Sequence, residues 1–308
     1  MTVKGAHLHV APEVEQAIVA GGPVVALESA LLSHGLPQAH ARSLAVRLDD
    51  VVRAQGAMPA LVVVREGRVE VGVDPHEIDF LFHPGVLKVG ERDLAAAVAG
   101  RGSGGTTVAG TLAVAERAGL RVLATGGIGG VHLGVDTSGD VSADLPALAR
   151  HPVVVVCAGA KAICDAARTV EMLDTLGVTV VGYRTDTMPG FFVRSSGVPV
   201  PHRRDTPAAI AAVAQAKADI GDRSALLVVQ PLPEHAALDE HTVSAAIAAA
   251  MTRARHEVVT GARLTPYLLA AVADATGGKT IAANVALLET NAHLAAAIAV
   301  AWTAGRHA

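Results

Sequence analysis

A lysine and a glutamate each follow an apolar run of the chain at short distance. The run Pro152–Ala158 reaches Lys161 after two small residues, and the run Pro23–Leu27 ends directly in Glu28. A neutral amine attacks a carbonyl carbon and forms an imine, whereas a partly desolvated carboxylic acid retains a proton that it can donate. The two residue types are therefore compatible with an enzyme that holds a carbonyl substrate as a Schiff base beside a proton donor.

Each of these residues also has a plain structural interpretation. Lys161 would be a solvated residue in the first turn of a helix, although the positive end of the helix dipole there disfavours the ammonium and favours the nucleophilic amine. Glu28 would cap a helix or pair with a cation. Lys88 is either an active-site cation or a surface lysine paired with Glu91 or Asp93. The residues alone leave these alternatives open.

A glycine-rich stretch before a predicted helix has the features of an anion site. Gly102–Thr107 places small residues and the hydroxyls of Thr106 and Thr107 at a helix start, where backbone N–H groups lack partners. No lysine follows in the Walker position, so a nucleoside triphosphate loop is not supported and a monophosphate is the more economical ligand. A loop shaped only by glycine geometry is the alternative.

The segment "GGIGGVHLGVDTSGDVSADL" fails the dinucleotide-binding pattern, because His132 stands where the third glycine should be. Asp136, Asp140 and Asp144 recur in it at four-residue spacing. Hard oxygen ligands in a loop suit Mg²⁺ or Mn²⁺. Alternatively, Ser142 or Asp140 caps a helix that begins near Ala143, and the spacing does not decide between the two.

Short β-branched runs alternate along the chain with longer alanine-rich segments of helical period. This alternation predicts an α/β fold, a mostly parallel sheet flanked by helices in α/β/α layers, within one domain spanning residues 1–308. The expected strands are Pro23–Leu27, Leu61–Val64, Arg121–Ala124, Pro152–Ala158, Thr179–Tyr183 and Ala225–Val229, and the expected helices are Gln38–Ala54, Thr106–Ala118, Ala162–Leu176 and Pro207–Ile220. Glu66-Gly67 predicts a hairpin between Val62–Val64 and Val69–Val73. Ligands of such sheets lie beyond the carboxyl ends of the strands, which is where Glu28 and Lys161 fall.

The composition excludes several classes of function. Only 2% of the 308 residues are aromatic and the net charge is −4, so nucleic-acid binding and nucleic-acid partners are disfavoured. Cys157 and Cys164 form neither a disulfide framework nor a zinc motif, which indicates a reducing, cytoplasmic location. The apolar stretch Leu294–Ala304 is too short to span a bilayer and predicts a packed terminal helix, so no membrane partner is expected.

Longer blocks of the chain carry a specific resemblance. They are "PVVALESALLSHGLP", "GGTTVAGTLAVAERAGLRVLATGGIGGVH", "DVSADLPAL", "PVVVVCAGAKAICDAARTVEMLDTLGV", "GYRTDTMPGFF", "TPYLL" and "TGGKTIAANVAL". Taken in order, these blocks resemble the pseudouridine-5′-phosphate glycosidase family over nearly the whole chain. The resemblance implies reversible cleavage of the C–C glycosidic bond between ribose 5-phosphate and uracil through a lysine Schiff base.

The resemblance also assigns roles to individual residues. Lys161 matches the covalent lysine, Glu28 the proton donor and Lys88 an active-site lysine that contacts the substrate. Asp140 matches the metal-binding aspartate, with Mn²⁺ or another divalent cation expected. The substrate-binding positions are Val108, Ser142, Ala143 and Asp144, while His132 and Asn284 lie in blocks that line the family's pocket, and Thr106 and Thr107 are our own candidates for holding the sugar phosphate. A homotrimer is the implied assembly.

Some positions depart from the family pattern. Leu133 stands where the family has arginine in His-Arg-Gly, and Gln230 stands where the family has asparagine in Asn-Pro-Ile-Pro. Lost polar groups near a pocket suggest an altered base. An alternative is therefore a diverged C-glycosynthase that attaches ribose 5-phosphate to an aromatic aglycone in natural-product biosynthesis. A non-catalytic sugar-phosphate-binding protein is a second alternative, although binding alone needs neither Lys161 nor Glu28.

Overall fold

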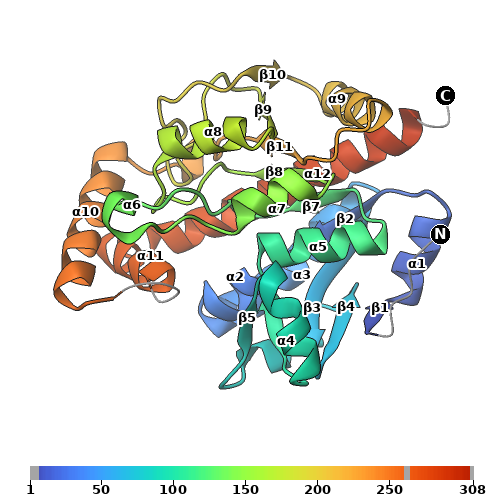
Figure 1. The fold of residues 1–308 in the computed structure, drawn as a ribbon, viewed down its shortest axis with the longest axis horizontal. Helices are drawn as coiled ribbons and strands as arrows, with labels where there is room; N and C mark the ends of the chain where they lie inside the picture. The colour runs from blue at the N-terminus through green and yellow to red at the C-terminus, as the bar shows by residue number, and fades with distance from the viewer. Residues whose placement is uncertain (1–6, 260–263, 306–308) are drawn as a thin grey trace.

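An eleven-stranded, mostly parallel sheet runs through the molecule, and helices lie on both of its faces (Figure 1). The computed structural model describes residues 7–259 and 264–305. The strands are β1 (Leu8–Val10), β2 (Val24–Leu27), β3 (Met58–Arg65), β4 (Arg68–Val71), β5 (Leu87–Val89), β6 (Gly104–Thr106), β7 (Val122–Ala124), β8 (Val154–Cys157), β9 (Thr179–Tyr183), β10 (His202–Arg204) and β11 (Leu226–Val229). The predicted α/β class is confirmed.

The α-helices and short 3₁₀ turns fill the connections between these strands. The α-helices are α1 (Pro12–Val19), α2 (Ala30–His34), α3 (Gln38–Ala54), α4 (Leu94–Ala99), α5 (Val108–Ala118), α6 (Val135–Ser138), α7 (Asp144–Arg150), α8 (Ala166–Thr175), α9 (Pro207–Asp219), α10 (Glu240–His256), α11 (Leu264–Ala275) and α12 (Lys279–Gly305). The 3₁₀ turns are η1 (Asp79–Phe82), η2 (Glu91–Asp93) and η3 (Glu234–Ala236). Helix α3 has the bounds that the periodicity predicts.

The sheet order is β1-β4-β3-β2-β7-β8-β11-β9-β10, with β6 paired to β3 and β5 paired to β6. Strands β2, β7, β8 and β11 are central, and every residue in them is buried. Their sequences are continuous apolar runs, because helices cover both faces of the sheet at these strands. Their parallel carboxyl ends meet at one edge, which places Glu28 after β2 near the segment that follows β8.

The sheet is not purely parallel, because β3 pairs antiparallel with both β4 and β6. The β3–β4 hairpin is the one that the sequence predicts. Its two turn residues, Glu66 and Gly67, have φ values of 50° and 79°, and left-handed backbone at both positions matches the twist of a tight hairpin.

Two of the predicted helices begin later than their periodicity suggests. Helix α8 starts at Ala166, because the preceding residues make β-bridges that pair Ala160 with Ile128 and Cys164 with His132. Helix α5 starts at Val108, because Thr106 belongs to β6. The placement of Lys161 in the first turn of a helix is therefore wrong, and the helix-dipole argument for its amine does not apply.

Helix α12 is longer than the predicted terminal helix and continues back to Lys279. Its 27 residues are long and apolar enough to cross a membrane by length and composition. In the structure the helix lies against β2, β7 and β8, with α3 and α9 beside it (Figure 1). Buried residues such as Leu288, Ala295 and Ile298 line its inner side, which makes α12 a core helix of the fold.

Candidate active site

A cavity of about 440 Å³ opens beyond the carboxyl ends of the central strands. Segments that are far apart in the sequence wall it: the β2–α2 junction, β5 with η2, the start of α5, the loop after β7, and the segment after β8. Most of the predicted site residues line it, namely Glu28, Lys88, Thr107, Val108, His132, Asp140, Ser142, Ala143, Asp144 and Lys161. Tertiary structure thus brings together residues that the sequence separates by more than a hundred positions.

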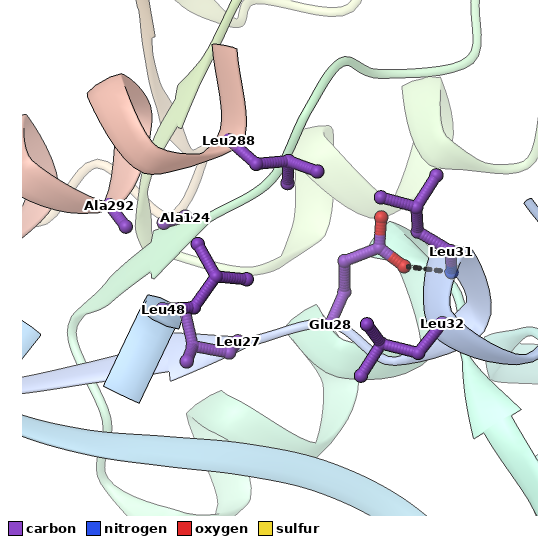
Figure 2. A pocket seen from close by; sticks show the side chains of 8 residues that line it. All are labelled: Leu27, Glu28, Leu31, Leu32, Leu48, Ala124, Leu288 and Ala292. Carbon is purple, nitrogen blue, oxygen red and sulfur yellow. Dashed lines mark hydrogen bonds between the residues drawn. The ribbon is translucent and has the colours of Figure 1, made fainter. Parts of the chain in front are cut away.

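The carboxyl group of Glu28 is buried, with 8% of the residue exposed. Leu27, Leu32, Leu48, Leu288 and other apolar side chains surround it, as Figure 2 shows. Oε2 accepts a hydrogen bond from the Leu31 backbone N–H at 3.3 Å, and Oε1 accepts one from the Thr125 hydroxyl at 3.1 Å. Burial raises the pKa of Glu28, while the nearby charge of Lys161 opposes that rise. Glu28 is therefore suited to carry a proton into a reaction.

Lys161 reaches the same cavity from the segment between β8 and α8. Its backbone N–H donates to the Ile128 carbonyl at 2.9 Å, so the residue extends the parallel alignment of β7 and β8 beyond their ends. Its side chain is half-buried. The position of the lysine is thus fixed by sheet-like pairing with the loop after β7 rather than by a helix.

Lys88, on β5, is a second cation at the cavity. Burial of its ammonium lowers the pKa of Lys88, and the positive charge of Lys161 lowers it further. The proposed surface pairing of Lys88 with Glu91 or Asp93 is not found, since Glu91 bonds to Arg150 and Asp93 to the Gly90 N–H. Lys88 and Lys161 therefore provide two amines on one cavity, where either can contact an anionic group of a substrate.

Asp144 ties two walls of the cavity together. Its Oδ1 accepts from the Ala109 N–H at 2.9 Å and its Oδ2 accepts from the Gly129 N–H at 2.8 Å. The Ser142 hydroxyl in turn accepts from the Asp144 N–H at 3.2 Å, but the N-cap residue of α7 is Ala143, so neither Ser142 nor Asp140 is the cap of this helix. Because the carboxylate of Asp144 is occupied by backbone donors, it fixes the shape of the cavity around the start of α5.

The predicted anion site at Gly102–Thr107 is partly corrected. Gly104, Gly105 and Thr106 form strand β6, and the Thr106 hydroxyl is buried against the Val62 carbonyl and Thr111, away from the cavity. The Thr107 hydroxyl caps α5 by accepting from the Gly110 N–H. Among the described residues, the N–H of Val108, a residue that lines the cavity, donates no hydrogen bond. One backbone donor of the helix start is therefore left for a ligand.

Asn284 also lies away from the cavity lining. It is a buried residue of α12, and its side-chain oxygen finds no hydrogen-bond partner among residues 7–259 and 264–305. A substrate contact of Asn284 therefore stays a prediction.

The three aspartates at four-residue spacing do not converge. Asp136 is paired with Arg168 at 2.8 Å, and Asp144 bonds to backbone amides, whereas Asp140 lines the cavity beside His132. Its Oδ2 lies 2.8 Å from Nδ1 of His132, a buried nitrogen without a well-directed hydrogen bond. In the described part of the chain no group of three metal-binding side chains occurs. One carboxylate and one imidazole fit a weakly held divalent cation that keeps several waters.

The thiols of Cys157 and Cys164 are unpaired and buried. Burial raises the pKa of each to about 12, so neither is a nucleophile at neutral pH. Lys161 is thereby the better candidate for covalent chemistry beside this cavity.

Two residues of the site had not been anticipated from the sequence. His34, at the end of α2, lines the cavity, and burial lowers the pKa of its imidazole. Thr125 follows β7 and donates to Glu28. A polar residue directly after a buried strand was the available signal for Thr125, the same signal that singled out Glu28.

A lysine and a buried acid on one cavity, at the carboxyl edge of a mostly parallel sheet, define the class: an α/β enzyme for a carbonyl substrate. The chain matches the family model of indigoidine synthase A-like proteins over residues 13–301. It is 49% identical to a pseudouridine-5′-phosphate glycosidase of Methylobacterium nodulans, over 97% of this chain and 89% of the relative. It is 44% identical to the enzyme of that name from Escherichia coli, over 95% and 94% of the two chains.

Solved structures agree with these relatives. The prealnumycin C-glycosynthase AlnA, in complex with ribulose 5-phosphate, superposes with a TM-score of 0.91 at 38% identity, over 98% of this chain and 99% of that chain. An indigoidine synthase A-like protein of Thermotoga maritima gives a TM-score of 0.87 at 32% identity, over 98% and 99%. The chain belongs to the pseudouridine-5′-phosphate glycosidase family of indigoidine synthase A-like proteins.

Proposed function

We propose that this protein cleaves pseudouridine 5′-phosphate into uracil and ribose 5-phosphate, and forms the same C–C bond in reverse. The observation that carries the proposal is the placement of Lys161 and the buried acid Glu28 on one cavity in a chain up to 49% identical to glycosidases of that name. A protein that only binds a sugar phosphate has no use for a buried acid with a raised pKa, so the non-catalytic alternative is disfavoured.

The proposed reaction has to break a C–C glycosidic bond, and this requirement determines the role of the lysine. A C–C glycosidic bond has no leaving heteroatom to protonate, so electrons must be drawn away from C1′ by another route. The Lys161 amine bonds to C1′ while the C1′–O4′ bond of the ribose ring breaks and O4′ takes up a proton. The nitrogen lone pair then forms C1′=N, the C1′–C5 bond breaks, and C5 of the base keeps the electron pair and is protonated.

Glu28 is the proton donor in this scheme. Its carboxyl group is held by Leu31 and Thr125 from either side, so it presents one orientation to the cavity. Water then hydrolyses the imine, which releases ribose 5-phosphate and restores the Lys161 amine. In the reverse direction Glu28 accepts the proton from C5 as the new C–C bond forms.

Lys88, the Val108 N–H and the Thr107 hydroxyl are the proposed partners of the substrate's anionic end. Asp140, with His132 beside it, would hold a divalent cation such as Mn²⁺. Such a cation would offset the negative charge of substrate oxygens. Ser142 and Ala143 line the same wall and are proposed substrate contacts.

The alternative of a C-glycosynthase for an aromatic aglycone rests on the altered positions Leu133 and Gln230 and on the similarity to AlnA. Neither residue lines the cavity. Identity to the curated glycosidases, at 49% and 44%, also exceeds the 38% identity to AlnA. Uracil is therefore the favoured base, and an experiment with uracil and ribose 5-phosphate distinguishes it from an aromatic aglycone.

We further propose that the protein acts as a homotrimer in the reducing environment of the cytoplasm. The unpaired state of both cysteines supports that location, and the family resemblance supports the trimer.

The first experiment traps the imine. The protein is incubated with ribose 5-phosphate and Mn²⁺, reduced with borohydride, and digested for mass spectrometry. A sugar adduct on Lys161 is expected, and Lys161→Arg should give none. Intact adduct formation by Lys161→Arg would overturn the covalent role of this lysine.

The second experiment identifies the base. Ribose 5-phosphate and uracil are supplied together, and formation of pseudouridine 5′-phosphate is followed by chromatography. Product is expected for the wild type and not for Glu28→Gln. An adduct on Lys161 without nucleoside product would favour the altered-aglycone alternative over the proposed function.

A further inference from the structure

A chain of three buried polar side chains lies behind Glu28, outside the cavity lining. Thr125, at the end of β7, is 0% exposed, Asn291 of α12 is 1% exposed, and Gln230, after β11, is 6% exposed. None of the three lines the cavity, so none is placed to touch the substrate.

Hydrogen bonds connect these residues in order. Gln230 Nε2 donates to Asn291 Oδ1 at 2.9 Å, and Asn291 Nδ2 donates to the Thr125 carbonyl at 2.7 Å and to the Gly126 carbonyl at 3.3 Å. The Thr125 hydroxyl then donates to Glu28 Oε1 at 3.1 Å. Three strand ends and the core helix are thereby joined to one carboxyl group.

Packing alone does not account for polar residues at these positions. Leu288 and Ala292, the neighbours of Asn291 on α12, are apolar and wall the small void beside Glu28 (Figure 2). An apolar residue at 291 would continue that wall without the cost of burying an amide. The amide instead holds the Thr125–Gly126 peptide, and with it the direction in which the Thr125 hydroxyl points.

Gln230 strengthens this interpretation because its buried side chain reaches Asn291. Its Nε2 donates to the Asn291 oxygen, the end of the amide that is not bonded to Thr125. Both ends of the Asn291 amide are therefore satisfied, which fixes its orientation.

Building on the proposed function, we infer that Thr125 is a positioning residue for Glu28, and that Asn291 and Gln230 act through Thr125. The hydroxyl donates its proton to one carboxyl oxygen while the Leu31 N–H holds the other, so the acid keeps a single rotamer for proton transfer. The bond also favours the carboxylate and thus limits how far burial raises the pKa of Glu28. The charged groups that face Glu28 are Lys161, Lys88 and Asp144.

The test compares Thr125→Val with Thr125→Ser in the cleavage of pseudouridine 5′-phosphate. Valine keeps the branched shape and lacks the hydroxyl, so kcat should fall about tenfold, as expected for one lost hydrogen bond in the transition state, while KM stays within about twofold. The alkaline limb of the kcat–pH profile should move to higher pH, because Glu28 loses a bond that favours its ionised form. Serine should restore both values.

Asn291→Leu tests the remote part of the chain. It should lower kcat in the same manner, and the double variant with Thr125→Val should lose no more than the larger single loss, since both changes break one pathway. Thr290→Val, at the preceding position of α12, is the control and should leave the pH profile unmoved, because among residues 7–259 and 264–305 the Thr290 hydroxyl bonds to the Ala286 carbonyl of its own helix alone.

The outcomes separate this inference from the function itself. Absence of turnover and of the Lys161 adduct in the wild type would overturn the proposed function. Wild-type turnover with an unchanged kcat and pH profile in Thr125→Val would overturn the positioning role while leaving the function intact. A loss of thermal stability alone in Asn291→Leu, with kcat and the pH profile unchanged, would show that Asn291 is merely structural.

Discussion

Two carboxyl groups in the same cavity are given different roles by their surroundings. Glu28 is enclosed by leucines and has two hydrogen-bond donors, one for each oxygen, whereas Asp144 bonds to two backbone amides that anchor it at the start of α5. Desolvation favours the protonated form of Glu28, and the amides hold Asp144 as an acceptor. Residue type alone would treat the two as equivalent.

The raised pKa of Glu28 makes a prediction about stability. A carboxyl whose pKa is higher in the folded state than its ordinary 4.5 adds stability below that value, and this contribution is lost as the pH rises through the folded-state pKa. Glu28→Gln carries no such dependence. The melting temperature of Glu28→Gln minus that of the wild type should therefore increase from pH 4.5 to pH 8, measured by differential scanning calorimetry.

The control for this measurement is Thr290→Val on α12, which changes no ionisable group, so its melting temperature minus that of the wild type should stay flat across the same range. A flat difference for Glu28→Gln as well would contradict the raised pKa.

At the scale of elements, close approach of backbone segments shapes the cavity. The loop after β7 passes so near to the start of α7 that a Cβ atom at Gly129 would lie 2.1 Å from the Ser142 Oγ and 3.1 Å from the Asp144 Oδ2. The glycine is therefore required by packing, since φ at this position is not in the left-handed region. Ser142 and Asp144 keep their places only while position 129 lacks a side chain.

Gly129→Ala should displace the Ser142 and Asp144 side chains and reduce kcat/KM by at least about tenfold, because misplaced contacts near a reacting centre are costly. Gly22→Ala is the matched variant and should retain activity, because Gly22 precedes the amino end of β2 and its new Cβ would lie 3.2 Å from the Ala17 carbonyl oxygen, outside the cavity lining. Steady-state kinetics of the two variants decides, and equal activity would show that the loop can shift to admit the methyl group.

At the scale of the whole molecule, helix α12 joins the sheet into one unit. It contacts β2, β7 and β8 as well as α3 and α9, so its apolar side chains belong to a core shared by most of the chain. The same helix contributes Asn291 to the hydrogen-bond chain behind Glu28. Stability and the site are therefore linked through α12.

Ile298 is completely buried on α12, and Ile298→Ala should lower the free energy of unfolding by about 2–5 kcal/mol. Val300→Ala, at a half-buried position of the same helix, should cost less. Denaturant titration followed by circular dichroism provides the comparison. Equal losses for the two variants would contradict the placement of Ile298 in the core.

The proposed homotrimer is tested by light scattering coupled to size-exclusion chromatography. Three times the chain mass of 31.2 kDa is expected for the protein in solution. A mass equal to that of one or two chains would overturn the trimer and leave the active-site proposals unaffected.

The sequence by itself determined the α/β class, the bounds of α3, the β3–β4 hairpin, and the positions of Glu28 and Lys161 at strand ends. These features depend on local patterns, namely hydrophobic periodicity, turn residues and a polar residue directly after a buried strand. The sequence also carried the family resemblance, because the matching blocks are long and continuous.

Only the tertiary structure decided which groups meet. Asp136 pairs with Arg168 rather than joining Asp140, and Asp144 accepts a hydrogen bond from the Ala109 N–H. The Thr106 hydroxyl bonds to the Val62 carbonyl within the sheet. Thr125 and Asn291 lie behind Glu28 and are joined by a hydrogen bond. Helical period also could not show that the residues around Lys161 are held by bridges to the loop after β7 instead of by a helix. Such contacts join residues distant in the chain, and their energies depend on burial and on competing partners that no local pattern encodes.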